Sequence, residues 1–253
     1  MTILGLLVAF GGVIGGQVLE GGHPGGLVQG TAFLIVIIGS LGATMVATPP
    51  ADMMLGVKAF MKSIFPTKND FGGVMDKILE LANLARREGL LALESFTSGT
   101  EGDPFLRKCL TLAIDGSSAE VIRETVEIDM MIAEEEATAG LKFWETWGAL
   151  CPTVGVLGAV LGLIHVMENL DNPAAIGPGI AVAFVATVYG VGYANVVCLP
   201  LSFKLKRYVQ HDQLMKSMIL DGVVGIQSGA APGALRSRLS VYAHDAHKGG
   251  DKH

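Results

Sequence analysis

The sequence is poor in charged residues, in aromatic residues and in cysteines that could pair. Only 17% of its 253 residues are charged and 6% are aromatic, whereas an average soluble domain carries about 25% charged residues. Cys109, Cys151 and Cys198 lie far apart and in no metal-ligand spacing, which excludes a disulfide scaffold and a zinc module. The net charge of −6 gives no reason to expect a nucleic-acid partner. No phosphate-binding loop or nucleophile motif is present, so neither an enzyme nor a bound metal or cofactor is expected.

Long apolar runs stand in place of the missing charge. Half of the residues are hydrophobic, and the mean hydropathy is +0.49. A membrane-spanning helix needs about 20 mostly apolar residues. Four runs qualify without any Asp, Glu, Lys or Arg, from about Ile3 to Leu19, Leu27 to Ala47, Gly148 to Met167 and Ala174 to Leu201. A signal peptide is the alternative for the first run, but that run lacks a basic start and a second span follows at once.

The basic residues indicate how the spans are oriented. All 18 Lys and Arg fall either between Pro49 and Trp147 or after Leu201. The positive-inside rule therefore places both segments, and both termini, in the cytoplasm. We expect an all-α membrane protein with four transmembrane helices in two hairpins and a helical cytoplasmic domain between spans two and three. The expected segments are a hairpin at 1–48, the cytoplasmic domain at 49–147, a hairpin at 148–201, and a cytoplasmic helix with a flexible tail at 202–253.

The segment between the hairpins has the period and the end signals of helices. Val74, Ile78, Leu81 and Ala85 follow one helix face, and Gly89 is expected to interrupt that helix or to begin a turn. Asp103-Pro104 is typical of an N-cap followed by proline, and Ser117 with Glu120 is typical of a capping box. From Ser118 to Trp147 the helical pattern is unbroken and enters the third span. After the last span, the polar end at Val241–His253 predicts disorder.

The spans lack the titratable side chains that ion pathways usually carry. His165, Glu168 and Glu20 stand at the outer ends of spans, where polar residues commonly mark the membrane interface. If the protein moves ions, another chain must therefore supply the titrating group. Small residues recur at the four-residue spacing of helix packing, at Gly11/Gly15, Gly12/Gly16, Gly158/Gly162 and Ala186/Gly190/Ala194.

Five stretches carry a more specific signal. They are Leu84–Glu94 (LARREGLLALE), Ala113–Gly116 (AIDG), Cys151–Gly158 (CPTVGVLG), Asp171-Asn172-Pro173 and Ala183–Gly190 (AFVATVYG). Together they resemble the MotA/PomA family of flagellar motor stator subunits. The likeness extends from Leu19-Glu20-Gly21-Gly22 to about Tyr242, and order, spacing and topology agree together.

This resemblance implies a function and a set of partners. Such subunits form a ring, a pentamer, around two copies of a single-span, peptidoglycan-binding partner of the MotB type, in the lipid of the bacterial inner membrane. The partner supplies the ion-binding aspartate, ion flow turns the ring, and the cytoplasmic domain pushes a rotor switch protein of the FliG type. We therefore expect an ion-conducting stator subunit, which agrees with spans that lack their own titratable group.

The resemblance also implies roles for single residues. Arg86 and Glu94 match the arginine and glutamate that engage the rotor, and Arg87 is expected to share that role. Long-range charge suits a contact that forms and releases repeatedly, and a solvated charged surface is the alternative. Pro152 and Pro200 match two prolines at the cytoplasmic ends of spans three and four. They are either hinges that couple the channel to the cytoplasmic domain or static kinks.

The coupling ion is expected to be the proton. Sodium needs several oxygen ligands in place of water, and sodium-driven members of the family have threonines where this chain has Ala159 and Ala186. Thr187 remains, and Tyr189-Gly190 resembles the sodium type, so the pattern is mixed. The residues expected to line the ion pathway are Thr153, Ala159, Ala186, Thr187 and Tyr189.

Two other functions fit parts of the pattern. An ExbB/TolQ-like energy-transducing subunit also surrounds a single-span partner. Those proteins resemble three-span chains with the large loop after the first span, whereas two spans precede the loop here. A channel or transporter that works alone would be expected to carry titratable residues inside its spans, and these four spans carry no carboxylate, lysine or arginine.

Overall fold

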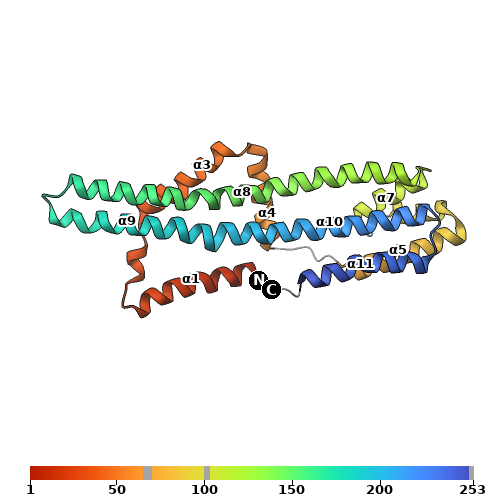
Figure 1. The fold of residues 1–253 in the computed structure, drawn as a ribbon, viewed down its shortest axis with the longest axis horizontal. Coiled ribbons are helices and arrows are strands. Elements are labelled where there is room, and N and C mark those ends of the chain that lie inside the picture. Colours follow the sequence, from red (N-terminus) through yellow and green to blue (C-terminus); the bar gives the residue numbers. More distant parts are fainter. Residues whose placement is uncertain (65–69, 100–102, 251–253) are drawn as a thin grey trace. The chain divides into compact units, whose positions relative to one another are not determined.

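The computed structural model describes residues 1–64, 70–99 and 103–250, and in this part of the chain every regular element is a helix (Figure 1). Four segments are long and apolar enough to cross a membrane, which confirms the expected all-helical fold with four spans. The elements in chain order are α1 (Thr2–Leu19), η1 (Pro24–Leu27), α2 (Gly30–Phe33), η2 (Leu34–Ile38), α3 (Gly39–Ala47), α4 (Pro50–Ile64), α5 (Phe71–Glu88), η3 (Leu90–Leu93), α6 (Glu94–Thr97), α7 (Pro104–Ile114), α8 (Ala119–Glu168), α9 (Pro173–Tyr193), η4 (Ala194–Cys198), α10 (Leu199–Gln227) and α11 (Pro232–Gly250).

The chain divides into two compact units, each built from two separate parts of the sequence. The first unit comprises Met1–Pro66 and Glu136–Lys206, and it contains all the apolar runs predicted as spans. The second unit comprises Thr67–Glu135 and Arg207–His253. The long helices α8 and α10 each contribute residues to both units.

In the first unit, α8 and α9 form an antiparallel hairpin held by small residues. A Cβ atom added at Gly158 would lie 2.8 Å from the Cβ of Ala186, and one added at Gly162 would lie 2.8 Å from the nitrogen of Ala183. The predicted small-residue packing of spans three and four is therefore confirmed. In α1, by contrast, a Cβ at Gly11, Gly12, Gly15 or Gly16 would meet nothing within 4 Å, so these glycines take no part in packing within the described chain.

Aromatic side chains join α4 to α8 in the same unit. Trp144 donates its indole N–H to the carbonyl oxygen of Gly56 at 2.9 Å. Gly56 itself must be glycine-sized, because a Cβ there would lie 2.5 Å from the ring of Phe143. The cluster comprises Phe60, Phe143, Trp144, Trp147 and Tyr193, with neighbouring ring centres 5.0–5.9 Å apart.

The second unit has its own hydrophobic core, and the predicted face of α5 forms one side of it. Ile78 and Leu81 are buried, and Val74 and Ala85 pack against the core at its edge. Gly89 ends α5 with a φ of +86°, a backbone conformation that glycine adopts without strain. The other fully buried large residues of this core are Leu93, Leu106, Leu110, Ile122, Val126, Met218, Ile219, Val223 and Leu239.

The helix-start signals are partly confirmed. The Asp103 carboxylate accepts hydrogen bonds from the backbone N–H groups of Phe105 and Leu106, at 2.7 and 3.2 Å, as an N-cap should. The capping box at Ser117 was wrong by one residue. Ser118 caps α8, since its hydroxyl accepts from the N–H of Val121 at 3.4 Å. Ser117 instead donates its own N–H back to α7, after the turn at Gly116.

The predicted disorder of the C-terminal tail was also wrong as far as Gly250. Helix α11 continues through Val241 to Gly250, and residues 251–253 lie outside the described residues. The helix is held because Leu235 and Leu239 are buried in the second unit's core. Polar composition at the very end of the chain concealed this apolar face.

Candidate functional site

The α8/α9 hairpin carries the residues expected to line an ion pathway. At its tightest point the two backbones touch, because a Cβ added at Gly190 would lie 2.6 Å from the carbonyl oxygen of Cys151. Ala186 is fully buried within this contact, against Gly158. Ala159, the next residue along α8, is half-buried. Neither alanine side chain carries an oxygen atom.

Thr153 and Thr187 are exposed on the outside of the hairpin. Each hydroxyl donates to its own helix, Thr153 to the carbonyl oxygen of Leu150 at 2.8 Å and Thr187 to that of Ala183 at 3.2 Å. Both hydroxyl oxygens keep lone pairs that can accept from another molecule. The surrounding exposed side chains are apolar and include Val156, Leu157, Phe184 and Val188. An apolar surface with isolated hydroxyls can be covered by a helix from another chain.

Tyr189 has a specific structural role in addition to any place along a pathway. Its hydroxyl donates to the carbonyl oxygen of Leu27 at 2.5 Å and accepts from the N–H of Gln29 at 3.2 Å. Both partners lie where the chain enters span two. Tyr189 therefore fixes α9 to the start of that span.

The residues beside Pro152 are anchored to span two. Trp147 donates its indole N–H to the hydroxyl oxygen of Ser40 at 3.0 Å. The same hydroxyl lies 3.3 Å from the sulfur of Cys151, and Ser40 and Cys151 are both fully buried. Pro152 itself lies inside an unbroken α8. Any bending at Pro152 would therefore act on a polar contact between two spans.

Pro200 lies two residues after a wider helical turn. The segment η4 is a π-helix, with one more residue per hydrogen-bonded turn than an α-helix. A proline has no N–H to donate to the carbonyl four residues back, here that of Val196. The wider turn accommodates this missing bond without breaking the helix. Pro200 is exposed, unlike its neighbours Cys198 and Leu201.

The three residues expected to contact a rotor are all exposed in the second unit. Arg86 and Arg87 lie in the last turn of α5, where positive charge is favourable. Glu94 begins α6, after the Gly89 turn and the short helix η3. None of the three forms an ion pair with another residue that the structure describes, so their charges face solvent. Buried Leu93 fixes the position of Glu94 next to it.

The described residues contain no group of three or more His, Cys, Asp or Glu side chains that could hold a metal. Burial raises the pKa of the Cys109 thiol to about 12, so this cysteine is a protonated core residue rather than a nucleophile.

Sequence reasoning missed the hydrogen bond from Trp147 to Ser40, which ties span two to α8. Ser40 was visible as a hydroxyl within an apolar run, and Trp147 as an aromatic residue at the edge of another. Nothing in the sequence paired them, since they are 107 residues apart.

Two family models match the chain. One, described as the MotA/TolQ/ExbB proton channel family, matches residues 98–218. The other, described as Motility protein A N-terminal, matches residues 3–89. The second match covers the first two spans and the start of the cytoplasmic segment, which distinguishes the chain from an ExbB/TolQ-like protein.

Known proteins are similar over nearly the full length. Motility protein A of Helicobacter pylori is 34% identical over 95% of this chain and 93% of its own. The chemotaxis protein PomA of Vibrio alginolyticus is 33% identical over 96% of this chain and 95% of its own. The structure of C. jejuni MotAB matches with a TM-score of 0.90 and 34% identity, covering 95% of this chain and 94% of that chain. The flagellar MotAB stator complex from Bacillus subtilis matches with a TM-score of 0.87 and 33% identity, covering 97% of each chain. The chain is therefore a multi-pass membrane protein that belongs to the MotA/PomA family of flagellar motor stator subunits.

Proposed function

We propose that this chain is the ion-conducting subunit of a flagellar motor stator, which works with a single-span partner of the MotB type to convert ion flow into torque. One observation carries the proposal. The four spans of this chain contain no Asp, Glu, Lys or Arg, so the chain cannot supply the carboxylate that an ion pathway needs. A partner helix that brings an aspartate to the exposed face of the α8/α9 hairpin completes the pathway.

The proton is the ion that this surface suits best. Ala186 is fully buried against Gly158, and its methyl group offers no oxygen to a sodium ion. Only Thr153 and Thr187 place hydroxyls on the exposed face, and both already donate to their own helix. A proton needs no cage of oxygen ligands, because it binds the partner's carboxylate directly and moves along water.

The mechanical output is assigned to the second unit. Exposed Arg86, Arg87 and Glu94 contact a rotor switch protein of the FliG type through complementary charge. Copies of this chain surround the partner as a ring of five in the bacterial inner membrane, with both termini in the cytoplasm. The distribution of all 18 basic residues supports this orientation.

Pro152 and Pro200 are proposed as the hinges that couple protonation of the partner to the push on the rotor. Protonation of the partner changes its contact with α8 and α9, and each proline allows its helix to bend there. The polar contact of Trp147 and Ser40 beside Pro152 then moves with the bend.

Complementation of motility tests this function. The chain is expressed, with and without a single-span partner from the same genome, in flagellated cells that lack their own stator genes. Swimming is expected only with the partner, it should continue when potassium replaces sodium, and a protonophore should stop it. Swimming that stops without sodium and survives the protonophore would overturn the proton assignment. Full swimming with no partner present would overturn the proposed function itself.

A further inference from the structure

Two of the three cysteines lie in contact inside the first unit, although they are far apart in the sequence. Cys151 belongs to α8 in the third span, and Cys198 ends the π-helix η4 of the fourth. Both side chains are fully buried, and their thiols form a hydrogen bond with each other. A Cβ atom added at Gly148, one turn before Cys151, would lie 2.9 Å from the Cβ of Cys198. The two spans are therefore close enough at this level for the sulfur atoms to meet.

The surroundings of the pair favour Cys151 as the sulfur that reacts first. The Ser40 hydroxyl lies 3.3 Å from the Cys151 sulfur and can donate a hydrogen bond to it. Trp147 donates its indole N–H to the oxygen of the same hydroxyl at 3.0 Å. The Cys151 sulfur therefore has two potential donors beside it, the Ser40 hydroxyl and the Cys198 thiol. Hydrogen bonds to a sulfur assist its reaction as a nucleophile.

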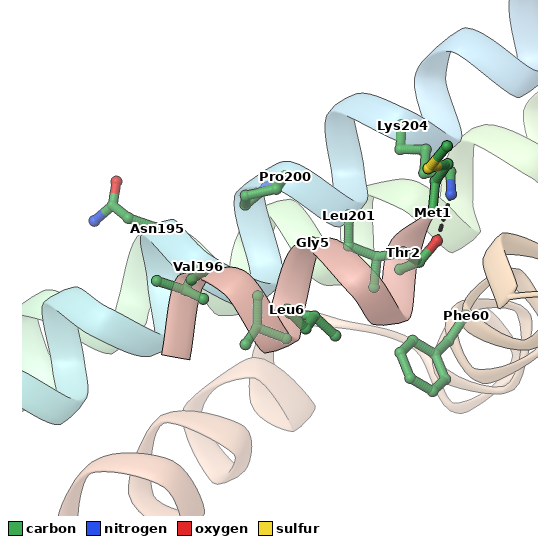
Figure 2. Close-up of a pocket in the computed structure, with 12 residues that line it drawn as sticks. Met1, Thr2, Gly5, Leu6, Phe60, Asn195, Val196, Pro200, Leu201 and Lys204 are labelled. Atoms are coloured by element: carbon green, nitrogen blue, oxygen red, sulfur yellow. Dashed lines mark hydrogen bonds between the residues drawn. The ribbon is translucent and has the colours of Figure 1, made fainter. Parts of the chain in front are cut away.

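The pair lies beside both proposed hinges, where the fourth span is weakly held. Cys151 directly precedes Pro152, and Cys198 lies two residues before Pro200. Pro200 has no N–H to donate within its helix, and local opening is easiest where backbone hydrogen bonds are missing. Val197, next to Cys198, lines an apolar groove of about 420 Å³ together with Pro200 (Figure 2). A small neutral oxidant can therefore reach the buried thiols when this turn opens locally.

We propose that Cys151 and Cys198 form a redox switch, which is reduced in the working subunit and is oxidised by hydroperoxides to a disulfide that locks spans three and four together. The thiols of the cytoplasm keep such a pair reduced under ordinary conditions. The oxidised product suits the site because a disulfide is electrically neutral. A soft metal ion such as Cu(I), held by two thiolates, would instead leave a net negative charge in an apolar interior.

The oxidation proceeds in two steps that balance. In the first step the Cys151 sulfur attacks one oxygen of hydrogen peroxide, the O–O bond breaks, and one water leaves with the proton of the thiol. The product is a sulfenic acid on Cys151. In the second step the Cys198 sulfur attacks the Cys151 sulfur, the S–O bond breaks, and a second water leaves with the proton of the Cys198 thiol. The two thiols are oxidised together, and one peroxide is reduced to two waters.

The effect on ion flow rests on the proposed function, whereas formation of the disulfide does not. If Pro152 and Pro200 bend in each working cycle, a covalent bond between their neighbours Cys151 and Cys198 stops both bends at once. Oxidised subunits should therefore remain assembled with the partner and conduct few protons. Reduction of the disulfide should restore conduction, since no other bond has changed.

Mass spectrometry of the intact complex tests the disulfide. The full chain is purified with a cysteine-free single-span partner, reconstituted in vesicles and treated with hydrogen peroxide. Remaining thiols are alkylated after denaturation, and the digest is analysed without reduction. We expect a linked peptide that joins Cys151 to Cys198 as the main oxidised product. Cys109 is the internal control, because it lies in the core of the second unit and should stay alkylated.

Proton flux into the same vesicles tests the switch. Peroxide should reduce the flux several-fold, and dithiothreitol should restore it. Cys198→Ser, and independently Cys151→Ser, keep a side chain of similar size and should conduct equally before and after peroxide. Cys109→Ser should respond to peroxide as the unmodified chain does.

Three outcomes would overturn the proposal. The first is the absence of the linked peptide after peroxide treatment. The second is a flux that does not change although the linked peptide has formed. The third is an equal loss of flux in Cys198→Ser, which would place the sensitive group elsewhere. Absence of flux from the untreated complex is a separate result, which would count against the proposed function, while the linked peptide would still decide whether the disulfide forms.

Discussion

The carboxylate of Asp221 accepts a hydrogen bond from the guanidinium of Arg123 at 2.8 Å, and this contact ties α10 to α8 within the second unit. Arg238 donates to the same oxygen at 2.9 Å, and the hydroxyl of Tyr242 donates to the other oxygen at 2.7 Å. Both of these residues belong to α11. Asp221 is only 7% exposed, so one buried carboxylate holds the C-terminal helix in place.

Replacement of this carboxylate should release α11. In Asp221→Asn, Arg123 and Arg238 lose their shared negative partner, and we expect a loss of about 3 kcal/mol in the free energy of unfolding. Limited proteolysis should then cut the chain near Gly229, between α10 and α11. Asp76→Asn is the matched control, since the Asp76–Arg236 pair is 3.7 Å long and mostly exposed and should contribute little. Equal protease resistance of Asp221→Asn and the unmodified chain would contradict the anchoring role.

The same cluster predicts how stability depends on pH. Burial raises the pKa of Asp221, but hydrogen bonds from Arg123 and Tyr242 and the charge of Arg238 outweigh it, so the net pKa lies below the ordinary aspartate value. A carboxyl group with a lowered pKa stabilises the fold above its unfolded-state pKa, and the contribution is lost as pH falls through the folded-state pKa. Thermal unfolding of the purified protein should show this acid loss, and Asp221→Asn should show less of it. An unchanged acid profile in the variant would contradict the assignment.

Tyr242 predicts a loss of stability at alkaline pH. Burial and its hydrogen bond to Asp221 raise the pKa of Tyr242 to about 12. Its contribution is therefore complete below the ordinary tyrosine pKa and is lost as pH rises through about 12. Tyr242→Phe should reduce the alkaline loss of stability in the same unfolding experiment. A variant with the alkaline profile of the unmodified protein would show that this hydroxyl contributes nothing to the pH dependence.

Charge reversal tests the rotor contact. Arg86→Glu and Glu94→Lys should each reduce swimming speed severalfold, because both side chains are exposed and their role is electrostatic. Membrane levels and co-purification with the partner should not change. Glu124→Lys, an exposed residue of α8 in the same unit, is the control for reversed charge alone. Normal swimming by both Arg86→Glu and Glu94→Lys would favour a merely solvated surface.

Thiol labelling tests the proposed topology. Cysteines introduced at exposed His23 and Asp171 should react with an impermeant reagent in intact cells, whereas one at exposed Ser98 should react only after lysis. The native cysteines are buried and give a silent background. Cys109 is unsuitable as the cytoplasmic probe, because its burial and its raised pKa prevent reaction on either side. Labelling at Ser98→Cys in intact cells would show that the proposed topology is inverted.

Features encoded by neighbouring residues could be predicted from the sequence. The buried face of Ile78 and Leu81, the cap at Asp103 and the turn at Gly89 each depend on a few consecutive residues, and the structure has all three. Small residues at helical spacing in spans three and four predicted close helix packing, and the structure places Gly158 against Ala186.

Contacts between distant residues could not be predicted in the same way. The hydrogen bond from Tyr189 to Leu27 joins residues 162 positions apart, and no hydrophobic periodicity or local motif predicts it. The anchoring of α11 was missed for a related reason, since Arg238 and Tyr242 lie in polar sequence and acquire their role only when Asp221 is placed opposite them. The exposed positions of Thr153 and Thr187 likewise depended on how α8 and α9 pack.

Proton flux into vesicles tests the central claim most directly. The chain is reconstituted alone, with its single-span partner, and with a partner whose membrane aspartate is replaced by asparagine, and internal pH is followed after an imposed proton gradient. The account predicts flux only with the intact partner, because the four spans of this chain contain no Asp, Glu, Lys or Arg. Equal flux from the chain alone, or with the asparagine partner, would contradict it.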